Sequence, residues 1–267
     1  MKRRNFLKTS AATVAAAALT GVLKSSAADT DAPKREFYEL RQYHLRRGPK
    51  QKIFDEFYKN AAIPAMNRLG IAPIGVFSTM IGPDSATMYV LMPHKSLDEF
   101  GTATDRLRAD AEYQKAGAEF VNAPASDPSY VRVESQLMVA FEGVPKVEVP
   151  AGAAENKPRI FELRTYESHS KKANKKKIEM FNTAEIAIFR KAGLRPVFFG
   201  ETLIGTKMPN LTYMLAYDDM AEHDACWKKF GSDPEWKKLS TTPGYTDAEI
   251  VCNISNIFLR PTAYSQI

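Results

Sequence analysis

Hydrophobic and polar residues alternate along the chain with two different periods. Residues 36–45 alternate around β-forming side chains, which predicts a strand. Residues 49–69 repeat apolar side chains at helical spacing, so we expect a helix that Pro64 kinks and Gly70 ends. The same criteria predict strands at 73–80, 86–92 and 130–141, helices at 95–106 and 110–121, and a turn at Gly82-Pro83-Asp84. This βαββαβ order is the ferredoxin-like plan.

The second half of the chain repeats this plan at an offset of 123 residues. Residues 37–43 read FYELRQY and residues 160–166 read IFELRTY, and the same offset links Gly70 to Gly193. The second copy is expected to hold strands at 159–167, 195–204, 210–217 and 249–260 and helices at 173–192, 219–230 and 233–240. A period this long indicates a duplicated domain. We therefore predict domains at 36–142 and 159–262, joined by a linker at 143–158 that contains three prolines.

One such α+β module leaves a face of its sheet uncovered, and that face must be buried against something. Two tandem ferredoxin-like modules can cover each other, which predicts a pseudo-dimeric α+β barrel. On the first strand Tyr38 and Leu40 point one way while Glu39, Arg41 and Tyr43 point the other. We assign the more apolar set to the helices, so that the Glu-Arg-Tyr set of each copy lines the space between the two sheets.

This Glu-Arg-Tyr set carries the strongest candidate chemistry. An arginine can bind a carboxylate with two hydrogen bonds, and a tyrosine can donate a hydrogen bond or a proton. The alternative is structural, with glutamate–arginine pairs that fix the register of the sheets. His44 flanks the first strand, and its counterpart is Glu167, a difference that favours a site in the first copy. The candidate ligand-binding residues are Glu39, Arg41, Tyr43, His44, Glu162, Arg164 and Tyr166.

The four histidines show no metal-binding spacing, so no dedicated metal site is predicted. Cys226 and Cys252 could form a disulfide in an oxidising compartment, although two small buried thiols are the preferred interpretation. Five lysines between 171 and 177 either form a solvated helix face or a docking surface for an acidic partner or anionic lipid.

The N-terminus carries most of the net charge of +6. Residues 1–28 contain five basic residues and no acidic one, and without them 32 basic residues face 31 acidic ones, so no nucleic-acid footprint is predicted. The run KRRNFLK at 2–8 is similar to a twin-arginine export motif. An apolar stretch at 11–23, too short to span a bilayer, and Ser26-Ala27-Ala28 complete a signal peptide. We expect a periplasmic or secreted protein with no transmembrane segment in the mature chain.

Several motifs together resemble the NIPSNAP family. They are the Glu-Leu-Arg-x-Tyr strand of each copy, Gly193-Leu194-Arg195-Pro196, the DPEW run at 233–236 and Leu259-Arg260-Pro261. The first copy departs from the last three, with GIAP at 70–73, DAEY at 110–113 and Ala140-Phe141 at its end. The resemblance covers about 36–142 and 159–262 and implies the dimeric α+β-barrel superfamily, which includes haem enzymes, cofactor-free monooxygenases and small isomerases.

The resemblance implies no defined chemistry, because fold alone is weak evidence for function. We expect an exported protein that binds a small ligand or a protein partner through the inter-sheet cavity or its surface. The alternative is an oxidoreductase, monooxygenase or isomerase of the dimeric α+β-barrel type that acts on a small organic substrate. The sequence requires no cofactor; a haem is the one the superfamily would admit, with His44 as its candidate ligand. A homo-oligomer is a further expectation.

Overall fold

The computed structural model describes residues 34–46, 48–82 and 86–267. The predicted signal peptide lies outside the described residues, as do two residues of the predicted turn at 82–84. The described chain forms one compact unit. Within it, no helix is both long and apolar enough to cross a membrane.

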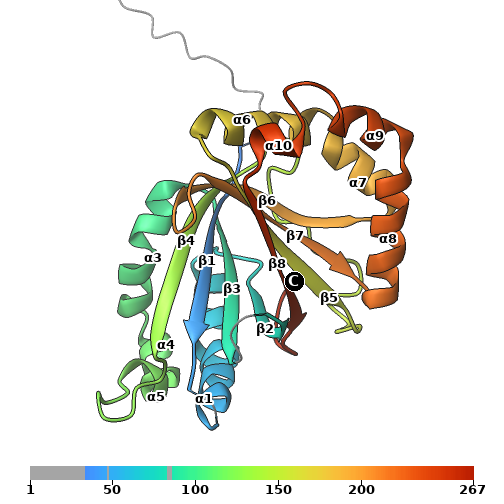
Figure 1. Cartoon of the computed structure of the whole chain (residues 1–267). Helices are drawn as coiled ribbons and strands as arrows, with labels where there is room; N and C mark the ends of the chain where they lie inside the picture. Colours follow the sequence, from blue (N-terminus) through green and yellow to red (C-terminus); the bar gives the residue numbers. More distant parts are fainter. Residues whose placement is uncertain (1–33, 47, 83–85) are drawn as a thin grey trace, which may run out of the picture. The chain divides into compact units, whose positions relative to one another are not determined.

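Eight antiparallel strands close into a barrel, as predicted (Figure 1). The first module contributes β1 (Phe37–His44), β2 (Gly75–Ile81), β3 (Thr87–His94) and β4 (Arg132–Ala140). The second contributes β5 (Ile160–Glu167), β6 (Arg195–Ile204), β7 (Asn210–Tyr217) and β8 (Asn253–Pro261). The strand order around the barrel is β1-β3-β2-β8-β5-β7-β6-β4, so the modules meet where β2 pairs with β8 and β4 with β6.

Helices cover the outside of the barrel, one set for each module (Figure 1). The first set is α1 (Lys50–Phe57), η1 (Tyr58–Ala62), α2 (Ile63–Arg68), α3 (Leu97–Ala109), α4 (Ala111–Ala116) and α5 (Ala118–Val121). The second set is α6 (Lys171–Met180), η2 (Phe181–Glu185), α7 (Ile186–Ala192), α8 (Met220–Ser232), α9 (Pro234–Ser240) and α10 (Asp247–Ile250). The short α10 was not predicted, because a four-residue helix shows no apolar periodicity.

The long helix of each module contains a π-helical turn, η1 or η2, at equivalent positions. In the first module this turn ends just before Pro64, where we expected a kink. The second module has Ala187 at that position and forms the same turn. The proline is therefore not its cause. Both long helices end at a glycine in the left-handed conformation, Gly70 with φ +81° and Gly193 with φ +96°, as predicted.

The predicted assignment of strand faces is wrong. Tyr38 and Leu40 of β1 pack with Phe161 and Leu163 of β5 in an apolar core inside the barrel that both modules share. Glu39, Arg41 and Tyr43 therefore face outward, toward the helices of their own module. The physical reason is that a buried charge needs polar partners, which the outward face supplies to Glu39 from Ser135 and His94 while the barrel interior is apolar. The Arg41 side chain lies beneath the helices and is still 26% exposed.

The two cysteines are both free thiols. Cys226 is buried on α8, as expected, but Cys252 is exposed just before β8. The expectation of two buried thiols is thus wrong for Cys252.

Candidate functional site

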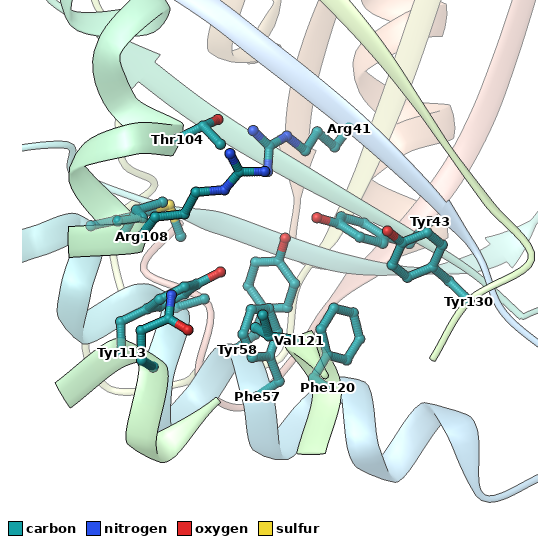
Figure 2. Close-up of a pocket in the computed structure, with 14 residues that line it drawn as sticks. Arg41, Tyr43, Phe57, Tyr58, Thr104, Arg108, Tyr113, Phe120, Val121 and Tyr130 are labelled. Carbon is teal, nitrogen blue, oxygen red and sulfur yellow. The ribbon is translucent and has the colours of Figure 1, made fainter. Parts of the chain in front are cut away.

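A cavity of about 240 Å³ lies between the sheet and the helices of the first module (Figure 2). Its floor is β1, which supplies Arg41 and Tyr43, and its walls come from η1, α3, α4 and α5. The polar groups that line it are two arginines, four tyrosines, a threonine and a glutamine: Arg41, Arg108, Tyr43, Tyr58, Tyr113, Tyr130, Thr104 and Gln114. Aromatic rings, among them Phe57 and Phe120, which stack with centroids 4.1 Å apart, form the apolar wall.

Arg41 is held in place by Glu39 from the same strand. The guanidinium donates from Nε to Glu39 Oε1 at 2.6 Å and from Nη2 to Oε2 at 3.1 Å, a bidentate pair. Ser135 on β4 also donates to Oε1, at 2.7 Å, and His94 Nε2 lies 3.8 Å from Oε2. Burial raises the pKa of the Glu39 carboxyl, but His94, Arg41 and Ser135 outweigh it and lower the pKa to about 2.

The outer edge of Arg41 faces the cavity. Its Nη1 makes no hydrogen bond to any residue that the structure describes, and no described aromatic ring lies over its plane. Burial opposes the charge on Arg41, yet the nearby Tyr43, Glu39 and Tyr58 raise its pKa, so the guanidinium stays charged. A fixed, charged donor that faces an open cavity can bind an anion with little loss of side-chain entropy.

Tyrosine hydroxyls surround this guanidinium (Figure 2). Tyr43 and Tyr58 have ring centroids 5.8 Å apart, and burial followed by the proximity of Tyr43 raises the pKa of Tyr58. Burial also raises the pKa of Tyr113. The raised pKa values keep Tyr58 and Tyr113 protonated at neutral pH, so their hydroxyls can donate hydrogen bonds to a bound anion.

The mouth of the cavity lies at α3, where Thr104 and Arg108 are exposed. Arg108 has one described ionic partner, Asp105, at 3.8 Å, and both side chains are largely in water. Figure 2 shows the Arg108 side chain reaching from α3 toward the same part of the cavity as Arg41.

His44 lies on the opposite face of β1, at one end of the barrel interior. Its Nε2 lies 3.3 Å from Glu134 Oε2, and its Nδ1 lies 3.4 Å from Thr87 Oγ1 and 3.3 Å from Arg132 Nη2. It does not join the other predicted site residues of the first copy. Because both ring nitrogens are engaged and the ring points away from the cavity, these residues do not fit a haem ligated by His44.

The equivalent site in the second module is filled by protein side chains. Arg164 donates from Nη1 to Glu162 at 2.7 Å and from Nη2 to the Tyr166 hydroxyl at 3.3 Å. Its Cζ lies 4.6 Å from the centre of the Trp227 ring, a cation–π contact. Trp227 also donates from Nε1 to Glu162 Oε2 at 3.0 Å. The predicted set Glu162, Arg164 and Tyr166 is brought together, but as a closed network.

A buried ion pair fills the rest of this space. Lys177 Nζ lies 3.1 Å from Glu185 Oε2, and both side chains are almost fully buried. Lys177 is also 5.0 Å from the Phe181 ring. Lys177 was expected on an exposed helix face, either solvated or docking a partner. Both expectations are wrong for this residue, whose side chain is buried. Its neighbours Lys175 and Lys176 do lie at the surface, where they pair with Glu201 and Glu179.

Comparison with known proteins accounts for both modules. The NIPSNAP family model matches residues 38–142 and again 161–266. The chain belongs to the NIPSNAP family. A twin-arginine translocation signal sequence matches residues 1–20 of this NIPSNAP chain, which supports export by that route. None of the curated proteins compared with the chain matches its sequence.

Some of the similar solved structures cover most of the NIPSNAP chain, and others cover less than half of it. A candidate monooxygenase from Fusobacterium nucleatum is 9% identical, and the match covers 86% of this chain and 93% of that one, with a TM-score of 0.57. An anthrone oxidase-like protein is 10% identical over 86% of this chain and 93% of its own, with a TM-score of 0.50. A NIPSNAP-like domain protein from Burkholderia xenovorans is 21% identical, covering 41% of this chain and 90% of its own, with a TM-score of 0.37. For the two matches that cover 86% of this chain, the similarity shows the fold alone.

Sequence reasoning missed most of the cavity of the first NIPSNAP module. Tyr58, Tyr113, Tyr130 and Arg108 lie on helices and loops, away from the strand motif. Residue differences between the two copies could have indicated these cavity residues. At the offset of 123, Ala62 is replaced by Glu185, Thr104 by Trp227 and Arg108 by Gly231, and all three first-copy residues line the cavity.

Proposed function

We propose that the first NIPSNAP module binds a small organic anion, with Arg41 as the fixed cation that the anion contacts. The observation that carries this proposal is the contrast between the two arginines. Arg41 is fixed by Glu39 with one edge toward a cavity, whereas Arg164 is covered by Trp227. We place this activity outside the cytoplasm, in the periplasm or beyond it.

The charges around the two sites support an anionic ligand. In the second module Glu162 and Glu185 balance Arg164 and Lys177. In the first module Glu39 balances Arg41, while Arg108 adds a cation at the mouth that is only loosely paired with Asp105. An anion in the first cavity would meet two guanidinium groups and several phenol donors, which favours a carboxylate or a phenolate.

The test is calorimetric titration of the purified protein with benzoate, phenol and cyclohexanecarboxylate, repeated on two matched variants. Arg41→Gln is expected to weaken binding of the acids by about tenfold or more, because a charge-assisted hydrogen bond is worth roughly 1.5–3 kcal/mol. Arg164→Gln, the same change in the filled site, is expected to lower the melting temperature and leave the affinity unchanged. Equal affinity in wild type and Arg41→Gln would contradict the proposal.

A second candidate function is oxidation of a phenolic substrate in the same cavity. What supports it is the resemblance of the tandem fold to a candidate monooxygenase and to an anthrone oxidase-like protein, each covering 86% of this chain. In this case Arg41 would stabilise the phenolate, the form of a phenol that reacts most readily with an electron acceptor. The check is oxygen uptake with phenols that bind; uptake that persists in Arg41→Gln would exclude this site as its source.

A further inference from the structure

In the second module the side chain of Trp227 occupies the space beside Arg164. Trp227 is on α8 at the position that Thr104 holds on α3, where the first cavity opens. The Cζ of Arg164 lies over its indole ring, 4.6 Å from the ring centre. The second module thus shows which kind of group the space over this arginine accepts.

The surroundings of the two arginines are alike enough to transfer this observation. Each arginine pairs with a glutamate two residues earlier on the strand and lies beside a tyrosine two residues later. Each module has the same π-helical turn facing that strand. The mouths of the two sites differ: Thr104 lines the first (Figure 2), whereas Trp227 stands at the equivalent position of the second.

We infer that the first cavity takes a planar aromatic acid whose ring lies over the Arg41 guanidinium, as the Trp227 ring lies against that of Arg164, and whose acidic group extends to Arg108. This inference rests on the proposed anion site and names the class of ligand. The cavity of about 240 Å³ has room for a fused two-ring system. The aromatic wall around Phe57 and Phe120 supplies edge and face contacts for the ring. Arg108 lies at the mouth, where it can meet an acidic group.

The first experiment compares 2-naphthoate with its saturated counterpart, decahydro-2-naphthoate, by calorimetric titration of the wild-type protein. The two acids have the same charge and a similar size, but only the aromatic one can stack on a guanidinium. We expect the saturated acid to bind roughly tenfold more weakly, the effect of a desolvated cation–π contact. Equal affinities would overturn the stacking inference while leaving the anion site in place. Absence of binding by both acids would contradict the proposed function itself.

The second experiment introduces a tryptophan into the first cavity. Thr104→Trp is expected to place an indole over Arg41, to weaken naphthoate binding at least tenfold and to leave the melting temperature unchanged or higher. Thr102→Trp adds the same ring to the exposed face of α3 and should bind naphthoate like the wild type. Naphthoate binding by Thr104→Trp at wild-type affinity would overturn the inference.

The reciprocal change opens the second site. In the Arg41→Gln background, whose first site is disabled, Trp227→Thr is combined with Lys177→Phe and Glu185→Ala, so that the second site carries the residues of the first copy. This variant is expected to restore binding of one naphthoate per chain, now over Arg164, and is compared with Arg41→Gln by titration and by circular dichroism. Failure of the folded variant to bind naphthoate, when wild type does, would show that the two arginine sites are not equivalent and would overturn the inference.

Discussion

Glu39 determines what Arg41 can do. A buried carboxylate that accepts hydrogen bonds from Arg41 and Ser135 is 5% exposed, and it fixes the guanidinium in one orientation. Its partner His94 is also buried, at 1% exposed, and was not singled out from the sequence. The Glu39–Arg41 pair therefore links ligand binding to stability. It positions Arg41 for a ligand, and it also keeps the buried Glu39 carboxylate paired.

The stability of the protein should depend on pH through Glu39. Its pKa in the folded protein is about 2, below the ordinary 4.5, so the stabilisation is complete above pH 4.5 and is lost as the pH falls toward 2. We expect the destabilisation caused by Glu39→Gln to shrink by about 2 kcal/mol between pH 6 and pH 3. Urea denaturation at both pH values measures this, with the exposed Glu119→Gln as the control. A constant difference would show that Glu39 is not preferentially ionised in the folded state.

At the scale of elements, the two long helices share a backbone shape and differ in what their π-helical turns carry. The second helix buries Lys177 and Glu185 where the first has Phe54 and Ala62. Burial raises the pKa of Glu185, and the neighbouring Lys177 opposes this shift. An apolar pair in one copy and an ionic pair in the other thus occupy the same place.

This pair gives a prediction about stability. Lys177→Met leaves Glu185 buried without its partner and should cost about 3–5 kcal/mol, whereas Lys177→Phe with Glu185→Ala restores the residues of the first copy and should be near neutral. Lys176→Met, next to it on the surface, is the control and should change little. The free energy of unfolding from chemical denaturation decides between these outcomes. A double variant as unstable as the single one would show that the pair contributes net stability.

At the scale of the whole molecule, neither module completes its own sheet. The β2 and β4 edges of the first module are paired only with β8 and β6 of the second, and the interior core takes side chains from both. Each half alone would expose two strand edges and an apolar face, which promotes association with another chain.

We therefore expect residues 34–142, expressed alone, to form dimers or larger species. Mixing them with residues 159–267 should yield a one-to-one complex whose mass is the sum of the two pieces. Size-exclusion chromatography with light scattering measures both results. A monomeric first half with native circular dichroism would contradict this account, because it would show that one sheet can be stable with its inner face in water.

The sequence by itself determined the repeat, the order of the main strands and helices, and the residues of the strand motif, because local periodicity and a constant offset suffice for these. It also predicted the barrel, because the uncovered sheet face of each copy must be buried against the other. Only the tertiary structure decided which face of β1 meets which layer, since both faces of a barrel strand under helices are buried and alternation alone does not tell inside from outside. It likewise decided that Arg41 is open and Arg164 covered, because Thr104 and Trp227 meet these arginines only through long-range packing.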